Sequence, residues 1–150
     1  MDHISNFIHG KYQKSESEKF LEVLDPSKGE VVKLVNNSNK SDLEKAVSSS
    51  KKGFVEWSNY TPLKRSRIIS DYKNLINANI KNLANIISIE HGKTYDDAIG
   101  SLTRGIEVIE FACGIPHLLK GEFSADVGTD IDSWSMRQPL GICVGITPFN

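Results

Sequence analysis

Short apolar runs separated by turn residues open the chain, a pattern typical of β-strands joined by tight turns. Apolar residues gather at 20–24 and again at 31–35, and Asp25-Pro26-Ser27-Lys28-Gly29 between them consists largely of turn-forming types. The preceding stretch NFIHGKYQ has the same character. The pattern predicts a β-arm of short strands at the start of the chain.

Apolar residues at every third or fourth position then predict a first helix. Ser41 and Glu44 have the spacing of a capping box, in which each side chain accepts a hydrogen bond from the backbone of the other residue. The apolar positions continue to Trp57. We predict a helix that begins at Ser41 and ends near Ser58.

A second helix is predicted to begin at Thr61 and Pro62, because threonine is a good N-cap and proline suits the first helical position. The sequence Asn-Ala-Asn at 77–79 predicts a break. Asn79 can cap a continuation, which should stop at Gly92, since glycine is the usual residue just beyond a helix end.

A further helix is predicted from about Tyr95 to Gly114. It carries apolar residues on two faces, which indicates that both faces are covered. Arg104 is a lone cation on the second face, among Val108, Phe111 and Ile115. A buried arginine needs an anion, and a salt bridge to Glu107 or Asp97 is the structural interpretation.

The pattern changes after Gly121. Residues 131–136 mix apolar and polar positions in near alternation, which predicts a solvated antiparallel strand. A nearly continuous apolar run follows, typical of a strand buried on both faces of a parallel sheet: Ile142, Cys143, Val144 and Ile146. We therefore predict an α/β or α+β fold whose parallel core begins at Gly141.

Composition narrows the classes of partner. The 150 residues include 18 basic and 19 acidic residues, and the basic ones are scattered, so a nucleic-acid partner is not expected. The opening residues lack the pattern of a signal peptide, and no apolar window is long enough for a membrane span. We expect a cytoplasmic protein without a membrane partner.

Two cysteines, Cys113 and Cys143, lie inside apolar segments, which predicts buried, reduced and unreactive thiols. The sequence has no metal-ligand spacing, so no metal is expected. Gly141 and Gly145 do not make a dinucleotide-binding fingerprint. Nothing in these residue types by itself assigns a cofactor.

Asn150 follows the predicted parallel strand, at the carboxyl end where open α/β sheets bind ligands. Its amide could donate a hydrogen bond to a developing oxyanion. An asparagine at that position can equally cap the next helix or close a turn. The residues alone leave both interpretations open.

The segment GICVGITPFN closely resembles the part of aldehyde dehydrogenases that enters the NAD-binding core. Its Pro-Phe-Asn ending, with EHGKTYDDAIGSLTRGIEVIEFACGIPHLLKGE, is similar to the methylmalonate-semialdehyde dehydrogenase branch. The resemblance spans 5–150 and implies roughly the first third of such a protein. It implies an N-terminal β-arm and the helical part of the NAD-binding domain at 1–121, oligomerisation strands at 122–139 and the truncated first strand of the parallel NAD-binding sheet at 140–150.

The resemblance also implies roles for individual residues. Asn150 would supply the side-chain donor of the oxyanion hole, and Arg104 would bind the carboxylate of the semialdehyde substrate. The nicotinamide end of the NAD site would be lined by Ile146, Thr147 and Phe149. The nucleophilic cysteine and the general-base glutamate of the family lie beyond residue 150, and neither Cys113 nor Cys143 replaces the nucleophile.

The implied activity is the NAD-dependent oxidation of methylmalonate or malonate semialdehyde with coenzyme A as co-substrate, giving propionyl-CoA or acetyl-CoA and CO2. The stretch Ser124–Gln138 resembles the family's oligomerisation arm, which implies a homotetramer. Two alternatives stay open: an aldehyde dehydrogenase that releases a free acid, and a non-catalytic, self-associating module. The 150 residues alone are expected to be inactive.

Overall fold

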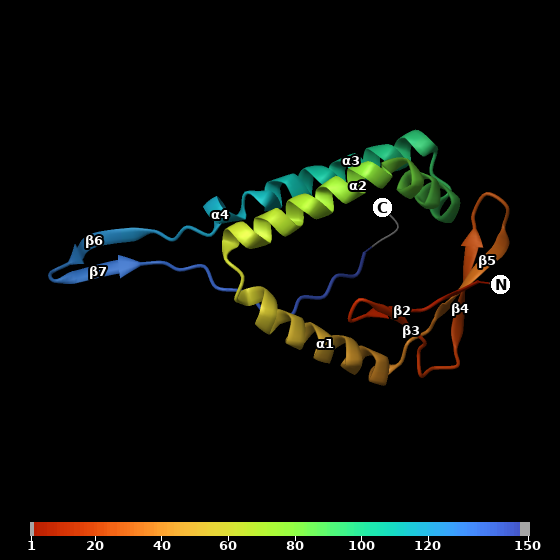
Figure 1. The fold of residues 1–150 in the computed structure, drawn as a ribbon, viewed down its shortest axis with the longest axis horizontal. Coiled ribbons are helices and arrows are strands. Elements are labelled where there is room, and N and C mark those ends of the chain that lie inside the picture. Colours follow the sequence, from red (N-terminus) through yellow and green to blue (C-terminus); the bar gives the residue numbers. More distant parts are fainter. Residues whose placement is uncertain (1, 148–150) are drawn as a thin grey trace.

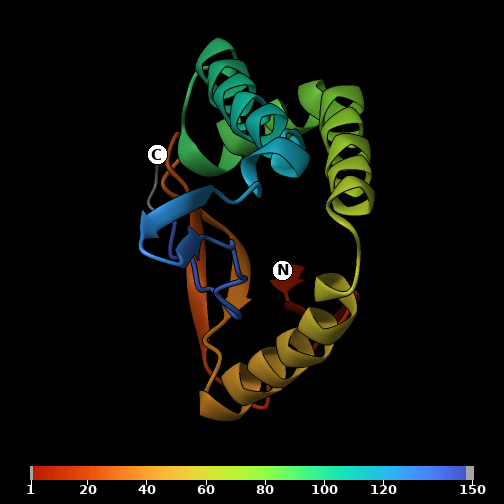
Figure 2. The same cartoon turned by 90° about the vertical axis from the view of Figure 1, so that its left-hand side faces the viewer.

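The computed structural model describes residues 2–147 and has a mixed α/β architecture. Helices α2 (Pro62–His91) and α3 (Tyr95–Cys113) lie side by side, and the short α4 (Ile115–Leu118) follows them (Figure 1). Helix α1 (Lys40–Ser58) diverges from this pair at the turn 59–61 (Figure 2). Strands occupy the two ends of the elongated molecule.

The predicted β-arm is confirmed. Strand β5 (Glu30–Asn36) lies in the centre of a three-stranded sheet, parallel to β1 (Asp2–Ile4) and antiparallel to β4 (Phe20–Asp25). Strands β2 (Asn6–Ile8) and β3 (Lys11–Gln13) form a separate hairpin. The turn between β4 and β5 closes through backbone hydrogen bonds to the Asp25 carbonyl.

Helix α1 ends at Ser58 as predicted, but the predicted capping box is wrong. The N-cap is Asn39, whose side chain accepts from the backbone N–H of Asp42 at 3.1 Å. Asp42 Oδ2 accepts in return from the Asn39 N–H at 3.1 Å. The helix therefore begins before Ser41, because Asn and Asp satisfy its free N–H groups at that earlier position.

Helix α2 has the predicted ends, with Thr61 as N-cap and Gly92 in the left-handed conformation at φ 77°. The predicted break at 77–79 is wrong, because α2 is continuous through it. Asn79 Nδ2 donates to the Leu75 carbonyl within the helix at 2.8 Å. Packing of α2 along α3 outweighs the low helix propensity of asparagine.

Helix α3 also has the predicted extent, but the described residues cover only one of its faces. Ala98 and Ile106 are buried, whereas Val108 and Phe111 are 69% and 71% exposed. Lys73 Nζ contacts Glu110 Oε1 at 3.2 Å and links the flank of α3 to α2. The predicted cover of the second face is not present in the described part of the chain.

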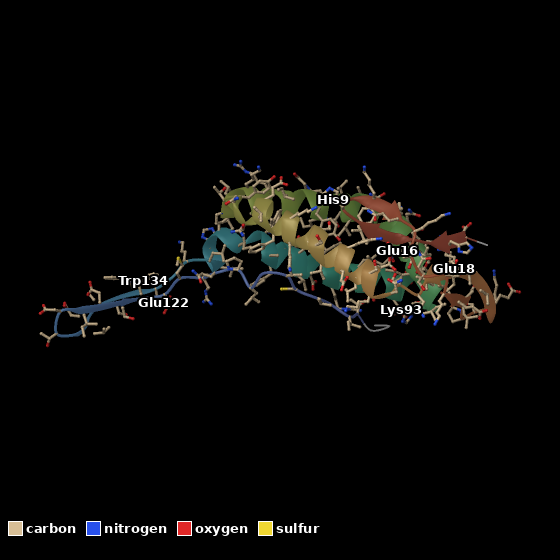
Figure 3. All side chains as sticks on the ribbon, turned by 90° about the horizontal axis from the view of Figure 1, so that it is seen from below. His9, Glu16, Glu18, Lys93, Glu122 and Trp134 are labelled. Atoms are coloured by element: carbon tan, nitrogen blue, oxygen red, sulfur yellow. The ribbon has the colours of Figure 1, made fainter. Side chains whose placement is uncertain are left out.

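Strands β6 (Phe123–Gly128) and β7 (Ile131–Trp134) form an antiparallel hairpin that projects away from the helices (Figure 1). Strand β7 confirms the solvated strand predicted from residues 131–136. At its base, the Ser135 N–H donates to the Glu122 carbonyl at 2.9 Å. Figure 3 labels Glu122 and Trp134 at this end of the hairpin.

Residues 141–147 are exposed and contain no strand, in contrast to the predicted parallel strand. A parallel strand exists only through hydrogen bonds to its neighbours, and residues 2–147 supply none for this segment. Cys143 is consequently exposed, so the prediction of a buried thiol is wrong for it. Cys113, at the end of α3, is half-buried.

The molecule has a large surface for its mass. Its accessible area is 11727 Å², whereas a folded monomer of 16.7 kDa exposes about 7,600 Å². The hydrophobic residues that are buried within 2–147 are Ala84, Ala98 and Ile106. The helix pair, the β-arm and the hairpin are therefore arranged without a large common core.

Candidate functional site

Arg104 lies on the exposed side of α3, between the turns that carry Gly100 and Val108. Its Nη2 donates to Ser101 Oγ at 3.2 Å. Within residues 2–147 it forms neither of the salt bridges considered from the sequence. Asp97 instead serves the helix start, where its Oδ2 accepts from Thr94 Oγ1 at 2.9 Å. The guanidinium is exposed rather than desolvated, so it is open to an external anion.

A second cation lies beside Arg104. Lys93, in the connection between α2 and α3, donates from Nζ to the same Ser101 Oγ at 3.0 Å. The Lys93 carbonyl accepts from Ser88 Oγ at 2.7 Å, which fixes the connection against α2. Figure 3 shows Lys93 at the end of the molecule opposite the β6–β7 hairpin.

These residues line a depression of about 280 Å³ on the N-terminal half of α3, formed by Lys93, Asp96, Asp97, Gly100, Ser101 and Arg104. The guanidinium fork matches the geometry of a carboxylate, and a second cation nearby strengthens the attraction. Asp96 and Asp97 in the same lining balance the two positive charges, so the feature that suits a small carboxylate is the guanidinium fork of Arg104, which neither aspartate pairs with in the described residues. Arg104 was identifiable from the sequence, whereas Lys93 and Ser101 were missed.

Ser101 had one sequence signal, its i−3 spacing from Arg104 on the same helix. Lys93 had no such sequence signal, because it lies in the connection before α3 and helical spacing does not relate it to Arg104. Both residues are half-buried, which separates them from the exposed Arg104. The loop that follows the C-cap Gly92 is what brings Lys93 to α3.

The residues predicted for the cofactor lie elsewhere or outside the described range. Ile146 is 94% exposed and Thr147 is also exposed, on the segment without regular secondary structure that follows Gly141. Neither lines the depression around Arg104. Phe149 and Asn150 lie outside the described residues. Among the described residues, Ile146 and Thr147 therefore do not share this depression with Arg104.

A second polar cluster joins the β-arm to α1. The carboxylate of Asp42, 3% exposed, accepts from Ser15 Oγ at 2.5 Å and from the Glu16 N–H at 3.2 Å. Glu16 also contacts Lys45. The Ser15 hydroxyl, followed by the backbone donors of Asn39 and Glu16, holds the pKa of Asp42 below its ordinary value. Every oxygen of Asp42 is occupied, so this cluster is structural.

Residues 2–147 contain no group of three or more His, Cys, Asp or Glu residues that could hold a metal ion. None of the helices in this range combines the length and the apolar character that a membrane crossing requires.

Family, sequence and structure comparisons all relate this chain to aldehyde dehydrogenases. Residues 12–150 match the model of the aldehyde dehydrogenase family. A rat mitochondrial protein named methylmalonate-semialdehyde/malonate-semialdehyde dehydrogenase [acylating] is 40% identical over 96% of the chain. A malonate-semialdehyde dehydrogenase of Pseudomonas aeruginosa is 40% identical over the whole chain. The chain spans 27% of the rat protein and 30% of the bacterial one.

A solved structure from Sinorhizobium meliloti, complexed with NAD and named as a methylmalonate-semialdehyde dehydrogenase, superposes on the chain with a TM-score of 0.95 at 43% identity. It is matched over 100% of this chain and 30% of its own length. The α/β architecture is thus that of the N-terminal part of the aldehyde dehydrogenase fold. On this evidence, the chain belongs to the aldehyde dehydrogenase family.

Proposed function

We propose that this chain acts as the N-terminal part of an NAD-dependent dehydrogenase that oxidises methylmalonate or malonate semialdehyde. The names of the rat and Pseudomonas relatives support the substrate class. The observation that carries the proposal is the depression around Arg104, where a guanidinium without a carboxylate partner in the described residues faces solvent. A substrate carboxylate would supply the missing anion.

Arg104 would fix the carboxylate end of the substrate and so orient the aldehyde at the other end. The planar fork can form two parallel hydrogen bonds with a carboxylate, which gives direction as well as affinity. An unsubstituted aliphatic aldehyde lacks this group. The proposed role therefore predicts selectivity for carboxylated aldehydes.

The test is Arg104→Leu in the full-length protein, with kcat/KM measured for malonate semialdehyde and for propanal. The ratio of the two values should fall about 10- to 150-fold, the equivalent of one charge-assisted hydrogen bond. Arg67→Leu, on the exposed side of α2, is the matched control and should leave the ratio unchanged. A ratio constant within about threefold for Arg104→Leu would contradict the proposal.

NAD is the proposed cofactor. When bound, its nicotinamide ring would accept the hydride that the substrate loses on oxidation. The exposed Ile146 and Thr147 fit this group, because residues 2–147 leave both side chains uncovered and they can lie against a planar ring. Phe149 would complete this lining. These residues would exclude water from one side of the ring and hold it in a fixed orientation.

Asn150 is proposed as the side-chain donor to the oxyanion that forms when the aldehyde is attacked. Asn150→Ala in the full-length protein should lower the single-turnover rate of oxidation about 10²-fold or more and leave NAD binding nearly intact. An unchanged single-turnover rate would remove Asn150 from the mechanism. NAD affinity, measured by titration, separates this effect from loss of the cofactor.

Coenzyme A is proposed as co-substrate, which gives propionyl-CoA or acetyl-CoA with loss of CO2. The word "acylating" in the name of the rat relative supports this outcome. The alternative enzyme releases a free acid. Product analysis with and without coenzyme A distinguishes them, because only the acylating enzyme forms a CoA thioester.

The β6–β7 hairpin is proposed to mediate a homo-oligomer, with a tetramer as the expected state. Its apolar side chains are exposed: Phe123 (66%), Val127 (57%), Ile131 (57%) and Trp134 (67%). An unpaired hairpin with such residues is suited to pairing with another chain. The same feature favours the non-enzymatic alternative, a self-associating module, which would form oligomers without turnover.

A further inference from the structure

Ser101 accepts hydrogen bonds from two cations that come from different segments. Lys93 Nζ approaches its Oγ at 3.0 Å from the α2–α3 connection, and Arg104 Nη2 approaches it at 3.2 Å from the next turn of α3. A serine oxygen has two lone pairs, so the two cations occupy its whole acceptor capacity. The hydroxyl thus joins Arg104 to a residue outside its own helix.

This use of a helical hydroxyl differs from the usual one. Serine and threonine within helices commonly donate to the carbonyl four residues earlier. Thr103, on the same helix, does so to Ile99 at 3.0 Å, and Ser50 does so to Ala46 in α1. For Ser101 the structure gives the two bonds from Lys93 and Arg104 instead.

Arg104 needs such an anchor, because a long, exposed side chain otherwise samples many rotamers. Within residues 2–147, the Arg104 side chain forms one hydrogen bond, the one from Nη2 to Ser101 Oγ. Nη2 uses one of its two hydrogens there, which leaves four guanidinium N–H groups for a ligand. The other terminal nitrogen of Arg104, Nη1, lies near Gly100. A Cβ added at Gly100 would be 3.6 Å from this nitrogen.

We infer that Ser101 is a positioning residue, which Lys93 holds in place so that it presents the Arg104 guanidinium to the substrate carboxylate. Lys93 also adds a second positive charge to the depression. This inference rests on the proposed role of Arg104 in substrate binding. It adds the residues that determine how well the guanidinium is oriented before the substrate arrives.

The experiment compares Ser101→Ala with Ser101→Thr in the full-length protein. Ser101→Ala should raise KM for malonate semialdehyde about 3- to 10-fold, leave kcat nearly unchanged and leave propanal kinetics unaffected, as expected for the loss of one hydrogen bond. Ser101→Thr keeps the hydroxyl and should restore most of the affinity. Thr103→Val, which removes a hydroxyl that bonds only the helix backbone, is the matched control and should change neither substrate.

Lys93→Met keeps an unbranched side chain, one atom shorter than that of lysine, and removes its charge and its donor. It should raise KM for malonate semialdehyde in the same direction as Ser101→Ala. The double variant should show less than the sum of the two effects, because both act through one hydroxyl. Strictly additive effects would overturn the link between Lys93 and Ser101.

The outcomes distinguish this inference from the proposed function. If Arg104→Leu lowers the substrate ratio while Ser101→Ala leaves it unchanged, the positioning role is wrong and the carboxylate role of Arg104 stands. If Ser101→Ala affects both aldehydes alike with a lower melting temperature, Ser101 is structural and the inference fails. If Arg104→Leu leaves the ratio unchanged, both the proposed function and this inference fail.

Discussion

Asp42 shows how one residue can serve two elements. Its position at the third residue of α1 completes the capping box with Asn39, and its carboxylate also binds the Ser15 hydroxyl and the Glu16 N–H. The start of α1 and the linker after β3 therefore depend on the same charged group. Charge-assisted hydrogen bonds of this kind require the ionised form.

The first prediction concerns the pH dependence of this contact. Because the pKa of Asp42 is lowered in the folded protein, its contribution is fully present above the ordinary value of 3.8 and is lost as the pH falls through the lower, folded pKa. Asp42→Asn should remove this dependence. The measurement is hydrogen exchange of the segment containing Glu16 between about pH 2.5 and 5, corrected for intrinsic exchange rates.

Glu44→Gln is the control, because Glu44 is exposed and, within residues 2–147, its ion pair is the surface one with Lys40. It should leave the exchange profile of the linker unchanged. If Asp42→Asn and the wild type show the same loss of protection at low pH, another group controls the linker and the assigned role of Asp42 is wrong.

At the scale of elements, local signals identified both ends of α2 but neither the start of α1 nor the continuous interior of α2. Thr61, Gly92 and the turn at 25–29 have the predicted roles, because each depends on backbone hydrogen bonds and dihedral angles within a few residues. The break expected at 77–79 is absent, since contacts with α3 act from a distant part of the chain. The same holds for the candidate site. Arg104 could be identified from the pattern of its own helix, whereas the position of Lys93 depends on the path of the loop between α2 and α3.

The second prediction separates a helix interior from a helix cap. Asn79→Ala should stabilise the protein by about 0.5 kcal/mol, because alanine has the higher helix propensity and Asn79 is exposed within a continuous α2. Thr61→Ala, at the true N-cap, should destabilise it by about 1 kcal/mol. Urea unfolding of both variants measures the difference. A loss of stability for Asn79→Ala similar to that for Thr61→Ala would indicate a cap at Asn79.

The third prediction concerns the base of the β6–β7 hairpin. A Cβ at Gly121 would overlap the carbonyl oxygen of Ser135, so Gly121→Ala should force the two strands apart where they leave the helices. If the hairpin mediates oligomers, this variant should shift the full-length protein toward smaller species in sedimentation velocity. Gly53→Ala on α1, where a Cβ meets no atom within 4 Å, is the control and should leave the oligomer unchanged. An unchanged oligomer for Gly121→Ala would argue against the hairpin as the interface.

At the scale of the whole molecule, the main feature is an accessible surface that is large for the mass of the chain. The accessible area is about 1.5-fold that of a typical folded monomer of this mass, and three hydrophobic residues are buried within 2–147. Apolar periodicity in the sequence identified the faces of the helices and the strand-like segment, but it could not say what covers them. Partners of a face lie far along the chain or on another chain, so their positions follow only from tertiary structure.

The last prediction follows from this surface. Expressed alone, the 150-residue chain should associate in a concentration-dependent manner and bind a hydrophobic dye, because exposed apolar residues gather in 140–146 and on the second face of α3. Replacing Leu140, Val144 and Ile146 by serine should reduce dye binding in proportion to the apolar area removed, since these side chains are 94%, 79% and 94% exposed. Light scattering and dye fluorescence measure both effects. A stable monomer with a sharp, cooperative unfolding transition would mean that the chain covers these faces itself, and it would count against a role as the N-terminal part of a larger enzyme.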